Sequence, residues 1–170
     1  MCIRDRFLDC EFTSVATPRL ISLALTSGSH EDEFYGELAM DSGRRRQSSK
    51  FTKHAVLPQL GQYGTAYADM QGIGAAIVDW LRKRSSPVDI AYDYHSDFDL
   101  LEAALVQADG GEELLRGLFP VHVAYLWGTS EAKAAADASW ADSTATIGLS
   151  RHHALADARA LSCAFKTIHG

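Results

Sequence analysis

The sequence predicts an α/β protein in which a mixed sheet of five strands is flanked by helices. Short apolar segments separated by brief polar turns come first in the chain, which is typical of an antiparallel meander. Later segments alternate between helical periodicity and short strand-like runs, so these strands are reached through crossover helices and are expected to run parallel to a neighbour. A chain of 170 residues suits one domain with one core.

The meander is expected to consist of three strands, at 7–12, 20–25 and 34–38. Pro18 marks the first turn, and a polar stretch at 27–32 forms the second. The middle strand is apolar throughout, which predicts burial on both faces. The polar segment 41–53 is expected to be a surface loop, whose arginine run at 44–46 is either solvated or in contact with phosphate.

The second part of the chain begins with a helix expected at 67–84, where apolar residues recur at steps of three and four from Met70 to Leu81. Ser85, Ser86 and Pro87 end this helix. The elements expected after it are a strand at 88–92, a helix at 97–106, a turn of helix at 112–118, a strand at 121–127, and helices at 129–140 and 150–166.

The composition, with 46% hydrophobic and 22% charged residues, is that of an ordinary globular protein. No apolar run approaches the roughly 18 residues of a membrane span, and a secretory signal is not expected. The three cysteines are scattered, which predicts reduced thiols in a cytoplasmic protein. Residues 1–6 resemble translated adapter sequence, so the expected domain is 7–168. The net charge of −6 does not indicate a nucleic-acid binder, although a metal-dependent nuclease can be acidic.

Asp9 and Glu11 lie two residues apart on the first expected strand, so they project from the same face. Two carboxylates this close repel each other and resist burial together unless a cation lies between them. Mg²⁺ or Mn²⁺ suits this role because hard cations prefer oxygen ligands. An edge strand with a solvated acidic face is the simpler interpretation of this stretch alone.

Two further acidic stretches are expected to converge on the same edge of the sheet. Asp93 and Asp97 flank the point where the fourth strand runs into a helix. Asp157 lies in the last helix, shortly after His152 and His153. Carboxylates that meet in this way require metal, and two divalent ions about 3.5–4 Å apart form a phosphoryl-transfer site. A nearby histidine, with an ordinary pKa of about 6.5, can take a proton from water.

The three stretches, in this order, resemble the motifs of the DEDDh 3′–5′ exonucleases, which have the RNase H-like fold. The first motif, Asp-x-Glu, matches Asp9 and Glu11. The second, an aspartate that opens a helix with apolar residues three and four positions later, matches Asp97. The third, His-x4-Asp, matches His152 and Asp157. The likeness extends furthest to small bacterial and phage 3′–5′ exoribonuclease-like proteins, whose first strand also reads Leu-Asp-Cys-Glu-Phe.

This resemblance implies a metal-dependent 3′–5′ exonuclease that shortens single-stranded RNA or short oligonucleotides and releases nucleoside 5′-monophosphates. Two Mg²⁺ or Mn²⁺ ions would be held by Asp9, Glu11, Asp97 and Asp157. His152 would be the general base. Small exonucleases of this type often pair, so the resemblance also implies a homodimer. The preference for RNA over DNA rests only on the family likeness.

The resemblance further implies that Phe12 and Thr13, which follow the first motif, contact the 3′-terminal nucleotide. Tyr94 and His95 lie beside Asp97 and are expected to line the same pocket. An aromatic residue at the end of a strand is more often part of the core, and base stacking keeps Phe12 a candidate for nucleotide contact. Trp127 and Trp140 are expected only to pack in the core.

Several alternatives stay open at this point. Asp93 ends a strand and competes with Asp97 for the second motif, whereas Asp99 is expected to face solvent. His153 competes with His152, because it lies four residues before Asp157 on one helical face. The alternative functions are a DNA 3′–5′ exonuclease of the same fold, a non-catalytic nucleic-acid or nucleotide-binding module, and a structural protein whose acidic strand faces water.

Overall fold

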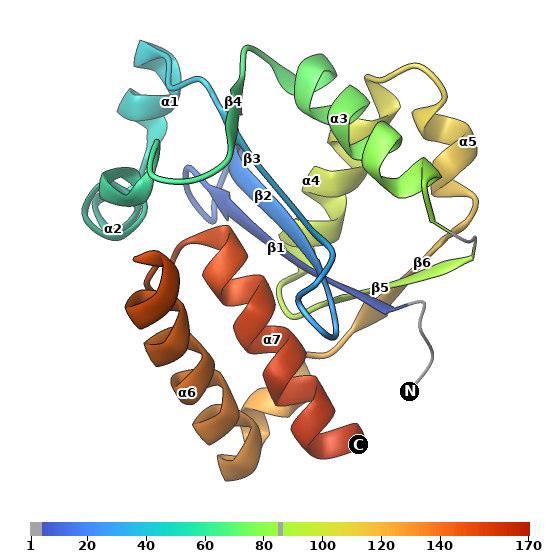
Figure 1. Cartoon of the computed structure of the whole chain (residues 1–170). Helices are drawn as coiled ribbons and strands as arrows, with labels where there is room; N and C mark the ends of the chain where they lie inside the picture. Colours follow the sequence, from blue (N-terminus) through green and yellow to red (C-terminus); the bar gives the residue numbers. More distant parts are fainter. Residues whose placement is uncertain (1–4, 85–86) are drawn as a thin grey trace.

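A computed structural model of the chain describes residues 5–84 and 87–170. These residues form an α/β fold around a mixed sheet of six strands, flanked by helices (Figure 1). The strands are β1 (Asp5–Phe12), β2 (Leu20–Ser27), β3 (Glu33–Leu38), β4 (Thr65–Tyr67), β5 (Val88–Tyr92) and β6 (Leu118–His122). Their order across the sheet is β4-β3-β2-β1-β5-β6. β2 is antiparallel to both β1 and β3, and β4, β5 and β6 each run parallel to a neighbour.

The longer helices cover both faces of the sheet, while α1 (Ser42–Gln47) and α2 (Lys50–Ala55) lie beside its end (Figure 1). The other helices are α3 (Met70–Arg82), α4 (His95–Val106), α5 (Gly111–Leu115), α6 (Ser130–Ile147) and α7 (Ala154–His169), with 3₁₀ turns η1 (Leu57–Gln59) and η2 (Ala124–Gly128). One layer contains α3, α4 and α5, and the other contains α6 and α7. None of the helices in the described parts of the chain is long and apolar enough to cross a membrane.

The alternation of side chains along β1 separates the core from the acidic residues. Leu8 and Cys10 pack on the face covered by α3 and α4. Phe7 packs on the other face, against Phe165 of α7 with ring centroids 5.4 Å apart. Asp9 and Glu11 follow Phe7 at steps of two, so both carboxylates lie on the α7 side of the sheet. Cys10 is buried on the opposite face from these two carboxylates.

The segment predicted as a surface loop at 41–53 instead contains α1 and α2. Each is six residues long and begins at a capping side chain: Asp41 accepts from the Arg44 N–H, and Ser49 accepts from the Thr52 N–H. Helices this short have too few turns to show a periodic apolar pattern, so capping residues were the better signal. Arg44 is buried and binds Asp41 at 2.8 Å and the Ala39 carbonyl at 3.0 Å, so it is not a free phosphate ligand.

The predicted count of five strands is wrong because β4 adds a sixth, three residues long, at the edge beside β3. The last strand was expected at 121–127 but lies at 118–122, where Pro120 occupies the other edge of the sheet. An edge strand tolerates proline because its outer N–H groups need no partner within the sheet. The residues after it, from Ala124 to Gly128, form the 3₁₀ turn η2.

The helix boundaries shift by a few residues from those predicted. α3 begins at Met70 because Tyr67 belongs to β4, and α7 begins at Ala154 rather than at 150. α6 continues past 140 and ends at Gly148, whose φ of 73° is the left-handed conformation that glycine adopts without strain. The expectations for Ser85, Ser86, Cys2 and the leader at 1–4 lie outside the described residues. Asp5 and Arg6 form the start of β1.

Candidate metal centre

The parallel pairing of β1 and β5 places two of the predicted aspartates side by side. Phe7 of β1 is in register with Ala91 of β5. Two residues further along the chain come Asp9 in β1 and Asp93 directly after β5, on the same edge of the sheet. Their proximity follows from the strand register, because residues that lie equally far beyond a paired position in two parallel strands are side by side.

Asp97 reaches the same place from the first turn of α4. Its carboxylate accepts a hydrogen bond from the Tyr94 N–H at 3.3 Å, which satisfies one of the free donors at this helix end. Its backbone carbonyl accepts from the Cys10 thiol at 3.5 Å, so α4 is attached to β1 beside the acidic residues. Asp97 is buried, whereas Asp99 is exposed as expected.

The ligand atoms of six residues form two compact groups. Carboxylate oxygens of Asp9, Asp93 and Asp97 lie within 4.8 Å of one another. Donor atoms of Glu11, His152 and Asp157 lie within 4.8 Å of one another in the second group. All four carboxylates of the predicted motifs are therefore in this region, and Asp93 joins Asp97 rather than replacing it.

Burial and mutual repulsion make these carboxylates unusual acids. Burial, followed by the negative charges of Asp157, Asp97, Glu11 and Asp93, raises the pKa of Asp9 well above its ordinary value. The pKa of Glu11 and that of Asp97 are also raised well above normal, mainly by burial. Burial raises the pKa of Asp157 to about 7. Without a cation, this group of residues therefore holds protons that isolated carboxylates would release.

A divalent cation fits this set of donors. Oδ2 of Asp9 is buried and has no hydrogen-bond partner in the described parts of the chain. A buried acceptor without a donor is costly, and a cation would satisfy it. All the ligand atoms in the two groups are oxygens except the imidazole nitrogen of His152, and this set suits Mg²⁺ or Mn²⁺.

His152 and His153 occupy different environments at the start of α7. His152 has a φ of 68°, in the left-handed region, and its N–H donates to both Asp157 oxygens at 3.1 and 3.3 Å. Its ring meets Phe51 of α2 edge to face, with centroids 4.8 Å apart. His153 is 2% exposed, caps α7 by accepting the Leu155 N–H at Nδ1, and stacks on Tyr35. His152 therefore belongs to the acidic site and His153 to the core.

Two tryptophans that sequence analysis assigns only to packing donate to the acidic residues. Nε1 of Trp127 donates to Asp93 Oδ2 at 2.6 Å, and Nε1 of Trp140 donates to Asp157 Oδ1 at 2.6 Å. Trp127 lies in η2 and Trp140 in α6. No local spacing connects either indole with its partner, which lies 34 or 17 residues away, so the sequence held no signal for these contacts.

A pocket of about 400 Å³ opens beside the carboxylates. The acidic part of its lining consists of Asp9, Asp93, Asp137 and Asp157, and the rest consists of His152, Trp127, Trp140, Lys133 and Arg151. Arg151 lies 4.6 Å from the centre of the Trp140 ring. The pocket therefore combines the ligand groups with two cations at its wall, which sequence analysis missed because they belong to no motif.

The four residues predicted to contact a nucleotide do not line this pocket. Phe12 and Tyr94 stack with ring centroids 5.7 Å apart, and Phe12 packs against the core cluster on the α3 and α4 side of the sheet. His95 is exposed beside Tyr94. Thr13 is buried, and its hydroxyl donates to the Thr17 carbonyl and accepts from the Arg19 N–H. The Thr13 side chain thus closes the loop between β1 and β2 through its own hydrogen bonds.

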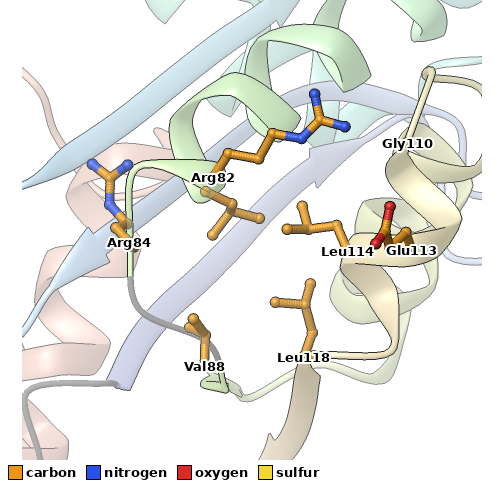
Figure 2. A pocket seen from close by; sticks show the side chains of 9 residues that line it. Arg82, Arg84, Val88, Gly110, Glu113, Leu114 and Leu118 are labelled. Carbon is orange, nitrogen blue, oxygen red and sulfur yellow. The ribbon is translucent and has the colours of Figure 1, made fainter.

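Another pocket, of about 360 Å³, lies at the opposite end of β5 and β6 (Figure 2). Its floor is apolar, with Val88, Leu114 and Leu118, and Glu113 and Arg82 lie at its edge. Arg84 turns away to pair with Asp32 and to stack on Trp80. Within the described residues this pocket holds no group of metal-binding side chains, so the carboxylate pocket is the better candidate for chemistry.

No protein-family model matches the chain, and a comparison with curated proteins finds no match either.

Proposed function

We propose that the chain is a metal-dependent 3′–5′ exonuclease with an RNase H-like fold, which hydrolyses the terminal phosphodiester bond of single-stranded RNA or short oligonucleotides. The observation that carries this proposal is the pair of ligand groups, Asp9–Asp93–Asp97 and Glu11–His152–Asp157, which line or adjoin one pocket. Two adjacent sites with oxygen ligands are the arrangement that phosphoryl-transfer enzymes use.

Each group would hold one Mg²⁺ or Mn²⁺ ion, with the carboxylates as ligands. When bound, the two ions stabilise the charge that develops on the phosphate and make water a better nucleophile. The chain itself contributes Arg151 and Lys133, whose positive charges at the pocket wall favour the phosphates of a substrate. Phe12 and Tyr94 do not line the pocket, so stacking of a base on them stays a prediction from the family likeness.

His152 is the proposed general base. Burial, followed by the nearby Arg151 charge, lowers its pKa from the ordinary value, so the ring is neutral at pH 7 and can accept a proton. Its neighbours Glu11 and Asp157 lie within 4.8 Å of its ring nitrogen. His153 lacks this access because its ring is buried against Tyr35.

The test uses 5′-labelled single-stranded RNA and DNA of equal sequence, with Mg²⁺, Mn²⁺ or EDTA. We expect a ladder that shortens from the 3′ end, release of nucleoside 5′-monophosphates, and no reaction in EDTA. Asp97→Asn should abolish the ladder. Asp99→Asn is the matched control, because Asp99 lies on the same helix but is exposed, and it should retain full activity.

The outcomes separate the alternatives. Faster shortening of DNA than of RNA would assign the chain as a DNA exonuclease. Binding of an oligonucleotide without cleavage in either metal would favour a non-catalytic module and reject the proposed activity. The cytoplasm is the proposed location because Cys10 and Cys163, the cysteines among the described residues, are free thiols. A homodimer stays a prediction from the family likeness.

A further inference from the structure

We propose that Trp127 and Trp140 are positioning residues of the metal centre, and that each fixes the orientation of one carboxylate toward an ion, Trp127 in the first ligand group and Trp140 in the second. This inference rests on the proposed function. Each ligand group contains one aspartate that accepts a hydrogen bond from a tryptophan indole. Trp127 donates to Asp93 in the first group, and Trp140 donates to Asp157 in the second, both at 2.6 Å. The two ligand groups are thus served by equivalent donors from η2 and α6.

An indole is well suited to this role. Its Nε1–H can donate but cannot accept, so it binds a carboxylate oxygen without competing for a cation. It also has no titratable proton in the relevant range, so the donor itself does not change with pH. A bond from N–H to an ionised carboxylate is among the stronger hydrogen bonds in proteins. The indole therefore fixes the rotation of the carboxylate around its last bond.

Both rings are held in place by their surroundings. Trp127 packs against the core cluster formed by Phe7, Val123 and their neighbours. Trp140 packs between α6 and α7, and the Arg151 guanidinium lies 4.6 Å from the centre of its ring. A donor held this firmly keeps its partner oriented without reorganisation when an ion binds, which is the function of outer ligands at known metal sites.

Both aspartates also have backbone donors. Asp157 accepts from the His152 N–H at 3.1 Å, and Asp93 accepts from its own N–H and from that of Tyr94. The indole is thus one of several donors at each carboxylate. We therefore expect the two ligand groups to depend on their tryptophans to a similar degree.

The experiment compares Trp127→Phe and Trp140→Phe, which keep an aromatic ring but remove the N–H. Trp80→Phe is the matched control, because the Trp80 indole also donates a hydrogen bond, to the Glu33 carbonyl at 3.1 Å, away from the metal centre. Mn²⁺ binding is measured by calorimetry on the metal-free proteins. Each site variant should bind Mn²⁺ about 10–100-fold more weakly, and the control should bind within about twofold of the native protein.

Unchanged Mn²⁺ affinity in both site variants would overturn the inference while leaving the exonuclease proposal intact. A native protein that binds no Mn²⁺ and degrades no oligonucleotide would instead reject the proposed function. Loss of affinity in only one variant would remove the other tryptophan from the proposal. Far-ultraviolet circular dichroism in EDTA shows whether each variant folds.

A measurement on the native protein keeps the test independent of variant folding. The chain has three tryptophans, so its ¹H–¹⁵N spectrum should contain three indole N–H resonances. Titration with diamagnetic Mg²⁺ should shift the resonances of Trp127 and Trp140 and leave that of Trp80 unmoved. If Mg²⁺ binds by calorimetry and the Trp127 and Trp140 resonances do not move, the indoles do not sense the ions and the inference is wrong.

Discussion

His152 and His153 are adjacent in the chain but face opposite sides of the start of α7. The His152 ring nitrogen lies within 4.8 Å of donor atoms of Glu11 and Asp157, whereas the His153 ring stacks on Tyr35 at 4.5 Å between centroids. The positive φ of His152 produces this separation, because it turns one residue toward the carboxylates just before the helix begins.

Replacing each histidine in turn should separate activity from stability. We expect His152→Ala to reduce exonuclease turnover by about 10²–10⁴-fold, the usual contribution of a general base. His153→Ala should instead lower the free energy of unfolding by about 1–2 kcal/mol, because it removes the cap of α7 and a buried ring. Turnover on labelled RNA and urea unfolding of both variants check this. The reverse pattern would mean that His153 is the base.

The left-handed backbone conformation of His152 should affect the free energy of unfolding of variants at this position. Alanine at a φ of 68° keeps the strain that glycine relieves, so His152→Gly should be more stable than His152→Ala by about 1 kcal/mol. Arg151, whose φ is not positive, is the control: there the glycine variant should be the less stable of the two. Urea unfolding of the four variants measures the difference between glycine and alanine at each position. Equal differences at positions 151 and 152 would contradict backbone strain at His152.

Metal-free protein should lose stability as the pH rises from about 4 to above 7. The pKa of Asp157 is about 7 in the folded chain and that of Asp9 is also raised, so the folded state binds more protons than the unfolded state in this range. The stabilisation is complete below the unfolded pKa of about 4 and is lost through the folded pKa. Urea unfolding in EDTA from pH 5 to 8 should show this decline, and saturating Mn²⁺ should flatten it.

The same repulsion predicts opposite effects of one substitution with and without metal. At pH 8 in EDTA, Asp9→Asn removes a buried acid whose ionisation is opposed by burial and by the neighbouring carboxylates, and it should raise the melting temperature by a few degrees, roughly 1 kcal/mol. In Mn²⁺ the variant should gain much less stabilisation than the native protein, because a ligand is missing. Thermal unfolding in both buffers measures the two effects. Asp99→Asn, on the exposed face of α4, should match the native protein in both.

The contact between α3 and α4 depends on a glycine. A Cβ at Gly74 would lie 2.1 Å from the Ala104 carbonyl oxygen, so Gly74→Ala should force the helices apart and lower the free energy of unfolding by about 2 kcal/mol or more. Gly72, in the same helix, has its nearest atom at 3.4 Å, and Gly72→Ala should be neutral or stabilising by up to about 1 kcal/mol. Equal losses of stability in both variants by urea unfolding would argue against this close approach.

The part of the site that sequence alone could predict is local in origin. Alternation along a strand puts Asp9 and Glu11 on one face, and helix periodicity puts Asp97 in the first turn of α4 beside the end of β5. Both relations involve residues only a few positions apart. The local geometry of a strand or a helix therefore fixes them, whatever the tertiary arrangement of the two elements. The same reasoning predicted the α/β class, the antiparallel meander and the helical layers.

Only the tertiary structure decided which histidine faces the carboxylates, that Asp93 joins them, and that Trp127 and Trp140 donate to them. Each of these depends on contacts between segments far apart in the chain or on a single backbone angle, which no periodicity encodes. The strand β4 and the helices α1 and α2 were missed for a related reason. Elements of three to six residues are stabilised by their neighbours and caps rather than by a repeating pattern of their own.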